Sequence, residues 1–246
     1  MAKRSGLGSV LYYDGYDLSG DKQSFSIASP MTPIDVTAIN KSAVERIGGR
    51  RDGSMSSVSF FNPAVGQGHE VESALLLTDR IYTIGIGATI GSPAAMLVAK
   101  QIGYDPTRTA EGELTFSLEA QGNGYGLEWG ELLTAGTRTD TGATNGASLD
   151  LTGSTAFGAQ FYLHVTAFTG TDVTIKIQDS ADDSSFTDLT AGAFTSVTTG
   201  PQSQRIQTAR NATVRRYLRV ATATTGGFTS VSFVVSAVKN TFTVNY

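Results

Sequence analysis

The sequence predicts a mainly β chain in two blocks, residues 1–135 and 148–246, joined by a Thr/Gly-rich linker over residues 136–147. Apolar and polar residues alternate through much of the first block, as they do in half-buried strands. Threonine and glycine dominate the break that follows, and short alternating segments resume after it. A chain of 246 residues is long enough for two domains that each bury a core.

Turn residues separate the first predicted strands. Asp14-Gly15 is a strong turn signal, and Pro30 and Pro33 interrupt the pattern further along. The most charged stretch, residues 45–53, holds two adjacent glycines and ends in Asp-Gly, which predicts a mobile loop between strands. The strands predicted in this part are residues 10–13, 24–27, 34–39 and 54–61.

One short helix is predicted in the first block. Asn62 and Pro63 suit the N-cap and first helical positions, and apolar residues then recur at helical spacing within residues 69–78. Residues 92–101 begin with helix-start chemistry, but their length also fits a buried strand, so both assignments stay open. The remaining predicted strands of this block are residues 81–86, 114–120 and 127–130.

The second block has the pattern of a β-sandwich. Its short segments are separated by turn residues at regular intervals, and in residues 160–168 and 230–238 one face is consistently apolar. This predicts an immunoglobulin-like or jelly-roll-like sandwich. The candidate strands are residues 148–152, 160–168, 173–178, 186–189, 194–197, 204–208, 216–221 and 230–238.

Composition favours an assembly subunit over an enzyme. Charged residues make up 16% of the chain and the formal net charge is −4, which argues against a nucleic-acid-binding surface that works by counterion release. Weakly charged, polar surfaces suit contacts between copies, because few charges must lose their water there. The chain has no cysteine, so thiolate chemistry and disulfides are excluded. No signal sequence or apolar run of membrane-spanning length is recognised, and folding in a cytoplasm is expected.

Four strings in the first block carry a resemblance to a known family. They are Leu-Tyr-Tyr-Asp-Gly-Tyr-Asp-Leu-Ser-Gly at 11–20, Glu-Arg-Ile-Gly-Gly-Arg-Arg-Asp-Gly at 45–53, Gly-Glu-Leu-Thr-Phe at 112–116 and Tyr-Gly-Leu-Glu-Trp-Gly at 125–130. In this order they resemble the major tail tube proteins of long-tailed bacteriophages of the siphovirus type, particularly those that infect actinobacteria. The resemblance covers residues 8–133.

The resemblance implies a fold and an assembly. The first block would be a β-sandwich or split barrel with one flanking helix, assembled as stacked hexameric rings around a channel that DNA crosses without sequence-specific binding. The protein would reside in the virion tail, would be made in the bacterial host cytoplasm, and would meet other tail proteins such as the tape measure and the terminator. In this family a long loop reaches the neighbouring ring, and the inter-subunit candidates here are Glu45, Arg46, Arg50, Arg51 and Asp52.

The second block looks like the β-sandwich domains that some tail proteins display on the tube exterior. It could instead complete a two-domain ring subunit. An alternative function is a tail decoration or tip protein whose C-terminal sandwich binds glycan on the host cell surface. Its Thr-rich polar surface motivates this alternative.

No catalytic, cofactor-binding or metal-binding constellation is predicted. His69 is expected at a solvated helix start, and His164 is expected to be exposed, on the strand face opposite the apolar row. Asp179, Asp182 and Asp183 lack the spacing of a calcium loop, so a turn between two strands explains them better.

Overall fold

The computed structural model describes residues 5–74 and 77–243, and it confirms the predicted mainly β class. The elements of the first half are β1 (Val10–Tyr13), β2 (Tyr16–Asp17), β3 (Lys22–Ala28), β4 (Met31–Asp35), β5 (Arg46–Arg51), β6 (Ser54–Phe60), α1 (Gly68–Glu72), β7 (Arg80–Gly85), β8 (Pro93–Arg108), β9 (Leu114–Gly122) and β10 (Glu128–Leu132). The second half contains β11 (Arg138–Asp140), β12 (Asn145–Asp150), β13 (Ala159–Gly170), β14 (Thr174–Ser180), β15 (Thr187–Ala193), β16 (Gln202–Gln207), β17 (Tyr217–Ala223) and β18 (Phe228–Lys239).

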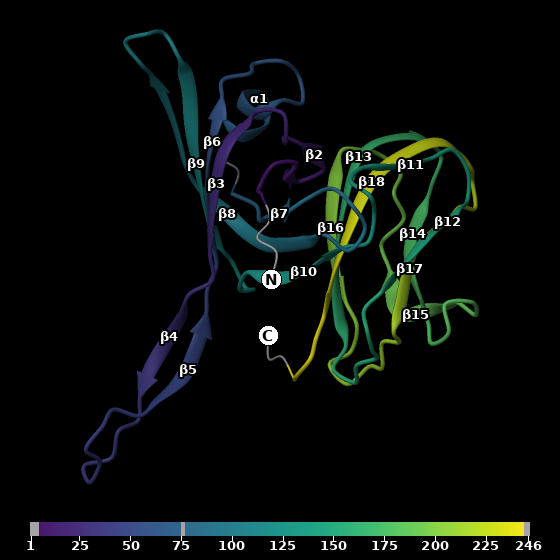
Figure 1. The fold of residues 1–246 in the computed structure, drawn as a ribbon. Helices are drawn as coiled ribbons and strands as arrows, with labels where there is room; N and C mark the ends of the chain where they lie inside the picture. Colours follow the sequence, from purple (N-terminus) through teal and green to yellow (C-terminus); the bar gives the residue numbers. More distant parts are fainter. Residues whose placement is uncertain (1–4, 75–76, 244–246) are drawn as a thin grey trace.

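The long strand β8 links the two layers of the first half (Figure 1). Its residues 94–99 pair with β7, which continues through β1 to β2. Its residues 99–108 pair with β9, which continues through β6 to β3. The layers enclose an apolar core of Leu11, Tyr13, Leu18, Met55, Tyr82, Ile84, Ala95, Leu97, Ala99, Leu118, Ala120 and Leu127.

The structure resolves the open assignment of residues 92–101 as strand. Its apolar run is buried on both faces, because alternate residues belong to different cores: Leu97 faces the core of the first half, and Met96 faces the junction with the second half. A strand that is buried on both faces has a continuous apolar sequence without alternation. The sequence pattern therefore could not distinguish this strand from a buried helix.

Two other local predictions need correction. The expected loop at residues 45–53 is mostly strand β5, which pairs with β4. Gly49 permits this pairing, since a Cβ there would collide with the carbonyl oxygen of Thr32. The predicted helix is shorter than expected, since α1 spans only Gly68–Glu72. Residues 75–76 of the predicted range lie outside the described chain.

The second half is a β-sandwich, as predicted. One layer contains β16, β13 and β18, and the other has the order β12-β17-β14-β15. The interior between them is built from buried aliphatic and aromatic side chains that include Phe161, Leu163, Val165, Phe233 and Val235.

The two halves share a sheet. Strand β10 pairs with β8 on one side and with β18 on the other, so backbone hydrogen bonds run continuously from one half into the other. Within the Thr/Gly-rich segment, Arg138–Asp140 forms β11 and also pairs with β18. The outer face of β13 and β18 is buried against the first half, where Tyr162 and Val234 pack with Tyr12 and Met96.

This junction overturns the prediction for His164, which is fully buried. The face opposite the apolar row points into the first half, not into water. The amide of Gly15 donates a hydrogen bond to His164 Nδ1 (3.2 Å), so Nε2 carries the proton and donates to Thr83 Oγ1 (2.9 Å). Desolvation lowers the pKa of His164 to about 3, and the ring is therefore neutral near neutral pH.

Candidate assembly surfaces

A four-stranded sheet with two open edges dominates one side of the first half. Strand β3 pairs with β6 alone, which leaves the outer edge of Lys22–Ala28 without a neighbouring strand in the described chain. Beyond Ala99, β8 pairs with β9 on one side, and its other edge likewise has no strand partner among the described residues. Open edges present unpaired backbone donors and acceptors, which template pairing with another chain.

The outer face of this sheet is rich in hydroxyl groups. Ser24, Ser26, Ser54, Ser56 and Ser117 occupy its strands at alternating positions, while the intervening residues turn inward to the core. Within β3, β6 and β9, all of which the structure describes, Glu119 supplies the one charge on this face. The face also carries apolar groups, since Val58 and Phe60 continue the outward series of β6, and on β8 the exposed Asp105 lies opposite Ser117, so the surface is mostly polar with few charges.

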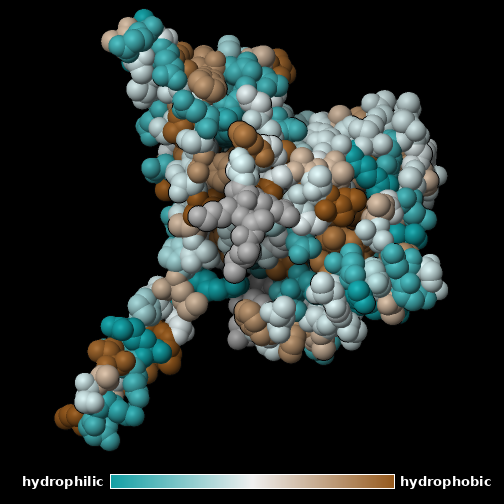
Figure 2. Space-filling model, in the orientation of Figure 1, coloured by the Kyte–Doolittle hydropathy of each residue, from teal (hydrophilic) through white to brown (hydrophobic). Residues whose placement is uncertain are grey.

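The β4–β5 hairpin projects from one end of the four-stranded sheet and forms a two-stranded sheet of its own (Figure 1). Its apolar side chains are exposed, with Ile34 47%, Ile47 53% and Ile39, in the connecting loop, fully accessible. Figure 2 shows hydrophobic side chains interspersed with hydrophilic ones along it. An isolated two-stranded hairpin is at best marginally stable in water, and exposed apolar side chains on such a hairpin are typical of a surface that binds a partner.

The predicted inter-subunit residues lie along this projection and at its base. Arg46, Arg50 and Arg51 belong to β5, and their side chains form no ion pair with the described part of the chain. Glu45 precedes β5 and pairs with Lys41 (2.9 Å). Asp52 is at the base, where it accepts a hydrogen bond from Gln121 Nε2 (2.7 Å). Sequence reasoning missed the exposed apolar residues, because the alternation in residues 34–39 has the signature of a half-buried strand.

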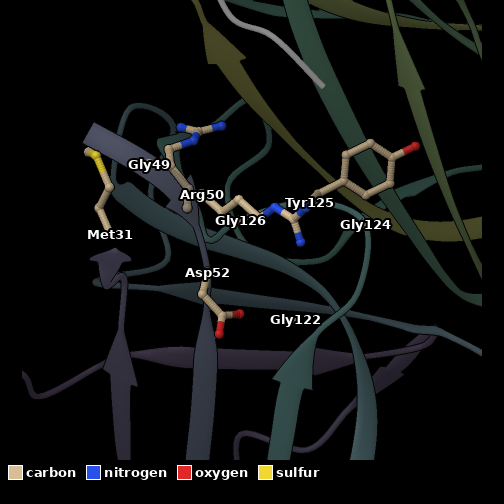
Figure 3. A pocket seen from close by; sticks show the side chains of 9 residues that line it. Met31, Gly49, Arg50, Asp52, Gly122, Gly124, Tyr125 and Gly126 are labelled. Carbon is tan, nitrogen blue, oxygen red and sulfur yellow. The ribbon is translucent and has the colours of Figure 1, made fainter. Parts of the chain in front are cut away.

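An open groove of about 730 Å³ lies beside the hairpin base. Figure 3 shows Arg50 and Asp52 lining the same groove as Tyr125. Tyr125 is in turn covered by the guanidinium of Arg205, which lies 3.9 Å from the ring centroid. The groove thus combines the charged side chains of Arg50, Arg51 and Asp52 with an aromatic wall, and glycines make up most of the remaining lining.

A second projection leaves the opposite end of the four-stranded sheet. Ser54 pairs with Gln121 at the hairpin end, whereas Phe60 pairs with Thr115 at the other end, where the β8–β9 turn extends outward (Figure 1). Glu111 and Glu113 are exposed on this second projection, and Asp105 is exposed in the adjoining sheet, where it lies opposite Ser117. Their carboxylates form no ion pair with the described residues.

Other predicted polar clusters have structural roles. Asp182 accepts hydrogen bonds from the amides of Ser184 and Ser185, which lowers its pKa and closes the turn between β14 and β15. Asp179 accepts a hydrogen bond from the amide of Arg215 (3.0 Å). Across the described residues, His, Asp and Glu side chains form no group of three or more that could hold a metal ion.

His69 is half-buried, and its Nδ1 lies 2.5 Å from Tyr104 Oη, so the expectation of a solvated histidine is wrong here. Its ring also packs on Phe61, with centroids 4.2 Å apart. None of the helices in the described part of the chain has the length and hydropathy that a membrane crossing requires.

Comparison with known proteins gives remote structural likenesses. No family model matches the chain, and no curated protein matches it. A chain in the virion of a native gene transfer agent particle is 16% identical with a TM-score of 0.44, over 52% of this chain and 98% of that one. The SPP1 Dit protein of a hub adsorption apparatus is 11% identical with a TM-score of 0.35, over 94% of this chain and 98% of that one. A chain of the phage p2 baseplate is 8% identical with a TM-score of 0.36, over 95% and 99%. At these identities and scores the likenesses do not assign a function.

Proposed function

We propose that this protein is a structural subunit that closes into rings through the open edges of its four-stranded sheet, and that stacked rings form the tail tube of a long-tailed bacteriophage. The observation that carries the proposal is the pair of open edges, on β3 and on the distal part of β8. The resemblance of residues 8–133 to tail tube proteins supplies the biological setting.

Strand direction supports ring closure. Across the sheet, β3, β6, β9 and β8 alternate in direction, because each neighbouring pair is antiparallel. When the β3 edge of one copy meets the β8 edge of the next copy in the same orientation, the two edge strands are also antiparallel. The alternation therefore continues unbroken from copy to copy. Head-to-tail contacts of this kind close into a ring when the rotation between copies is suitable.

The chemistry of the sheet faces supports one choice of the side that lines the channel. The rest of the chain packs on the inner face of the sheet, so the thin serine-rich face would point to the ring centre. Hydroxyl groups and the carboxylate of Glu119 offer no cation for DNA phosphates, so DNA could pass without being held. The C-terminal sandwich would then lie on the outside, and the partners of the tube would include other tail proteins such as the tape measure and the terminator.

Chemical cross-linking between the two edges tests ring closure. Because the chain has no cysteine, Ser26→Cys in β3 and Thr107→Cys in β8 would carry the only thiols of a double variant. A flexible bis-maleimide can bridge these two thiols at more than one register of the β3 edge of one copy against the β8 edge of the next. We expect the double variant to give a ladder of oligomers that ends at the ring, whose size counts the subunits.

Matched controls sharpen this test. Each single cysteine variant should give no ladder, and mixing the two single variants should give dimers. A monomeric double variant at concentrations at which tail proteins assemble would refute the proposal. Retention of the full-length monomer on host cell-wall glycan, together with the absence of rings, would instead favour the decoration or tip alternative.

A further inference from the structure

Four peptide bonds of the chain join an Asn or Asp residue to a following glycine. Glycine has no Cβ, so its amide nitrogen can approach the side-chain carbonyl carbon of the residue before it and close a succinimide ring. The fold decides which of these peptides react, because a peptide that is buried or held in a strand must open first. The four pairs are Asp14-Gly15, Asp52-Gly53, Asn123-Gly124 and Asn145-Gly146.

Three of these peptides are held by the rest of the structure. Gly15 is buried, and its amide donates a hydrogen bond to His164 Nδ1 (3.2 Å). Gly53 is buried as well, and its amide donates to Asp52 Oδ1 (2.7 Å). Gly146 lies within β12, which pairs with β17. Each of these glycine peptides therefore has little freedom to turn toward the preceding side chain.

The remaining pair, Asn123-Gly124, lies in the exposed turn between β9 and β10. Gly124 has a φ of +79°, and apart from its chain neighbours no atom lies within 4 Å of the position that a Cβ would take. Within the part of the chain that the structure describes, the Gly124 amide donates no hydrogen bond. The Asn123 side chain is exposed, and its Nδ2 donates to both carboxylate oxygens of Asp79 (2.9 and 3.0 Å).

We propose that Asn123 is a site of spontaneous deamidation in the folded protein. The Gly124 amide nitrogen gives up its proton and attacks Asn123 Cγ, so that a new N–C bond forms while the bond from Cγ to Nδ2 breaks and ammonia leaves. Water then opens the succinimide at one of its two carbonyl carbons, which yields aspartate or isoaspartate. Water is the only co-reactant. This inference does not depend on the proposed ring-forming function.

Deamidation changes a contact beside the base of the β4–β5 hairpin. The new carboxylate has no proton to donate to Asp79, so two carboxylates would face each other and repel. Isoaspartate also adds a methylene group to the backbone at Asn123. The adjacent Gly122 amide donates to the carbonyl oxygen of Gly53 at the hairpin base (2.7 Å). Deamidation should therefore loosen the link between this turn and the hairpin base, and it adds a negative charge to the loop that lines the groove.

Peptide mapping by mass spectrometry tests the proposal after storage of the full-length protein at mildly alkaline pH. Deamidation gives the mass change from an amide to an acid, and the presence of isoaspartate identifies the succinimide route. We expect Asn123 to convert about tenfold or more faster than Asn145, because a strand must open before its peptide can react. In urea the two residues should convert at similar rates, since both precede glycine.

The same measurements contain the outcomes that would refute the proposal. If Asn123 stays intact in the folded protein while it converts in urea, the fold protects the site and the proposal fails. Equal rates at Asn123 and Asn145 in the folded protein would also overturn it. Asn123→Gln is the matched control: it keeps an amide donor for Asp79 but closes the larger ring much more slowly, so this position should remain unmodified.

Amide hydrogen exchange tests the structural consequence. Asn123→Asp reproduces one product, and we expect exchange of the Gly122 amide to become about tenfold faster, because the turn opens more often. Adding Asp79→Asn should slow this exchange again, since the new amide can donate to the new carboxylate. Far-UV circular dichroism verifies that both variants are folded. Unchanged exchange in Asn123→Asp would contradict the proposed loosening of the turn.

Discussion

Acidification should destabilise the protein through His164, a side chain at the junction of the two halves. Its Nδ1 accepts a hydrogen bond from the Gly15 amide, so a proton on Nδ1 would abolish that bond and place a charge in a fully buried site. The replacement His164→Asn keeps an acceptor near the position of Nδ1 and removes the titration.

The magnitude follows from the two pKa values of the ring. In the unfolded chain the pKa is near the ordinary 6.5, and burial lowers it to about 3 in the folded protein. The unfolded state therefore binds a proton first as the pH falls, and the contribution of the neutral ring to stability is lost progressively below about pH 6.5. One pKa unit corresponds to about 1.4 kcal/mol, so this loss reaches about 2–3 kcal/mol near pH 4.5.

Urea unfolding of both proteins at about pH 7 and about pH 4.5 measures this effect. The original protein should lose about 2–3 kcal/mol more than His164→Asn over this interval, because carboxylate titrations are common to both and cancel. The variant will be less stable at neutral pH, but its pH dependence should be flatter. An equal loss of stability in both proteins would refute the burial argument.

Three further changes test other features. Gly130→Ala should destabilise the fold by about 3 kcal/mol or more, because a Cβ there would overlap the carbonyl of Ala237, where β10 pairs with β18. Thermal unfolding measures this loss, and an unchanged stability would contradict the pairing. Lys22→Met leaves the buried Glu72 carboxylate without its cation and should cost about 3–5 kcal/mol in urea unfolding, with partial recovery when Glu72→Gln is added. Ile47→Ser should change the free energy of unfolding of the monomer by less than about 0.5 kcal/mol but reduce tube yield, and normal tube yield would show that the hairpin does not bind.

The sequence predicted the fold class and many strands, because alternation is a local signal that a half-buried strand carries in its own residues. The strand pattern of the C-terminal sandwich is one example, with apolar residues such as Leu163 and Val235 turned to the interior. A short helix was also anticipated near its position, but the predicted start is wrong: the N-cap is Gln67, and the Asn62 side chain instead donates a hydrogen bond to Asp21.

Burial between elements distant in sequence could not be predicted in the same way. Alternation alone predicts an exposed His164, because the groups that cover it come from distant parts of the sequence: Tyr12 of β1, the Gly15 amide in the β1–β2 turn and Thr83 of β7. The reverse holds for Ile34, which alternates like a half-buried residue but is about half exposed, with no layer of the described residues covering it. The candidate site residues from Glu45 to Asp52 were chosen by charge, whereas the open edges of β3 and β8 leave no trace in residue type and emerge from topology alone.

The shared sheet has a consequence for anyone who divides this protein. A fragment that begins at residue 148 would lose β10 and β11, which pair with β18. One edge of this long strand would then have no hydrogen-bonding neighbour. Tyr162 and Val234, now sealed at the junction, would face water. Such a fragment would tend to self-associate, so its binding and solubility in isolation would differ from those of the same residues in the intact chain.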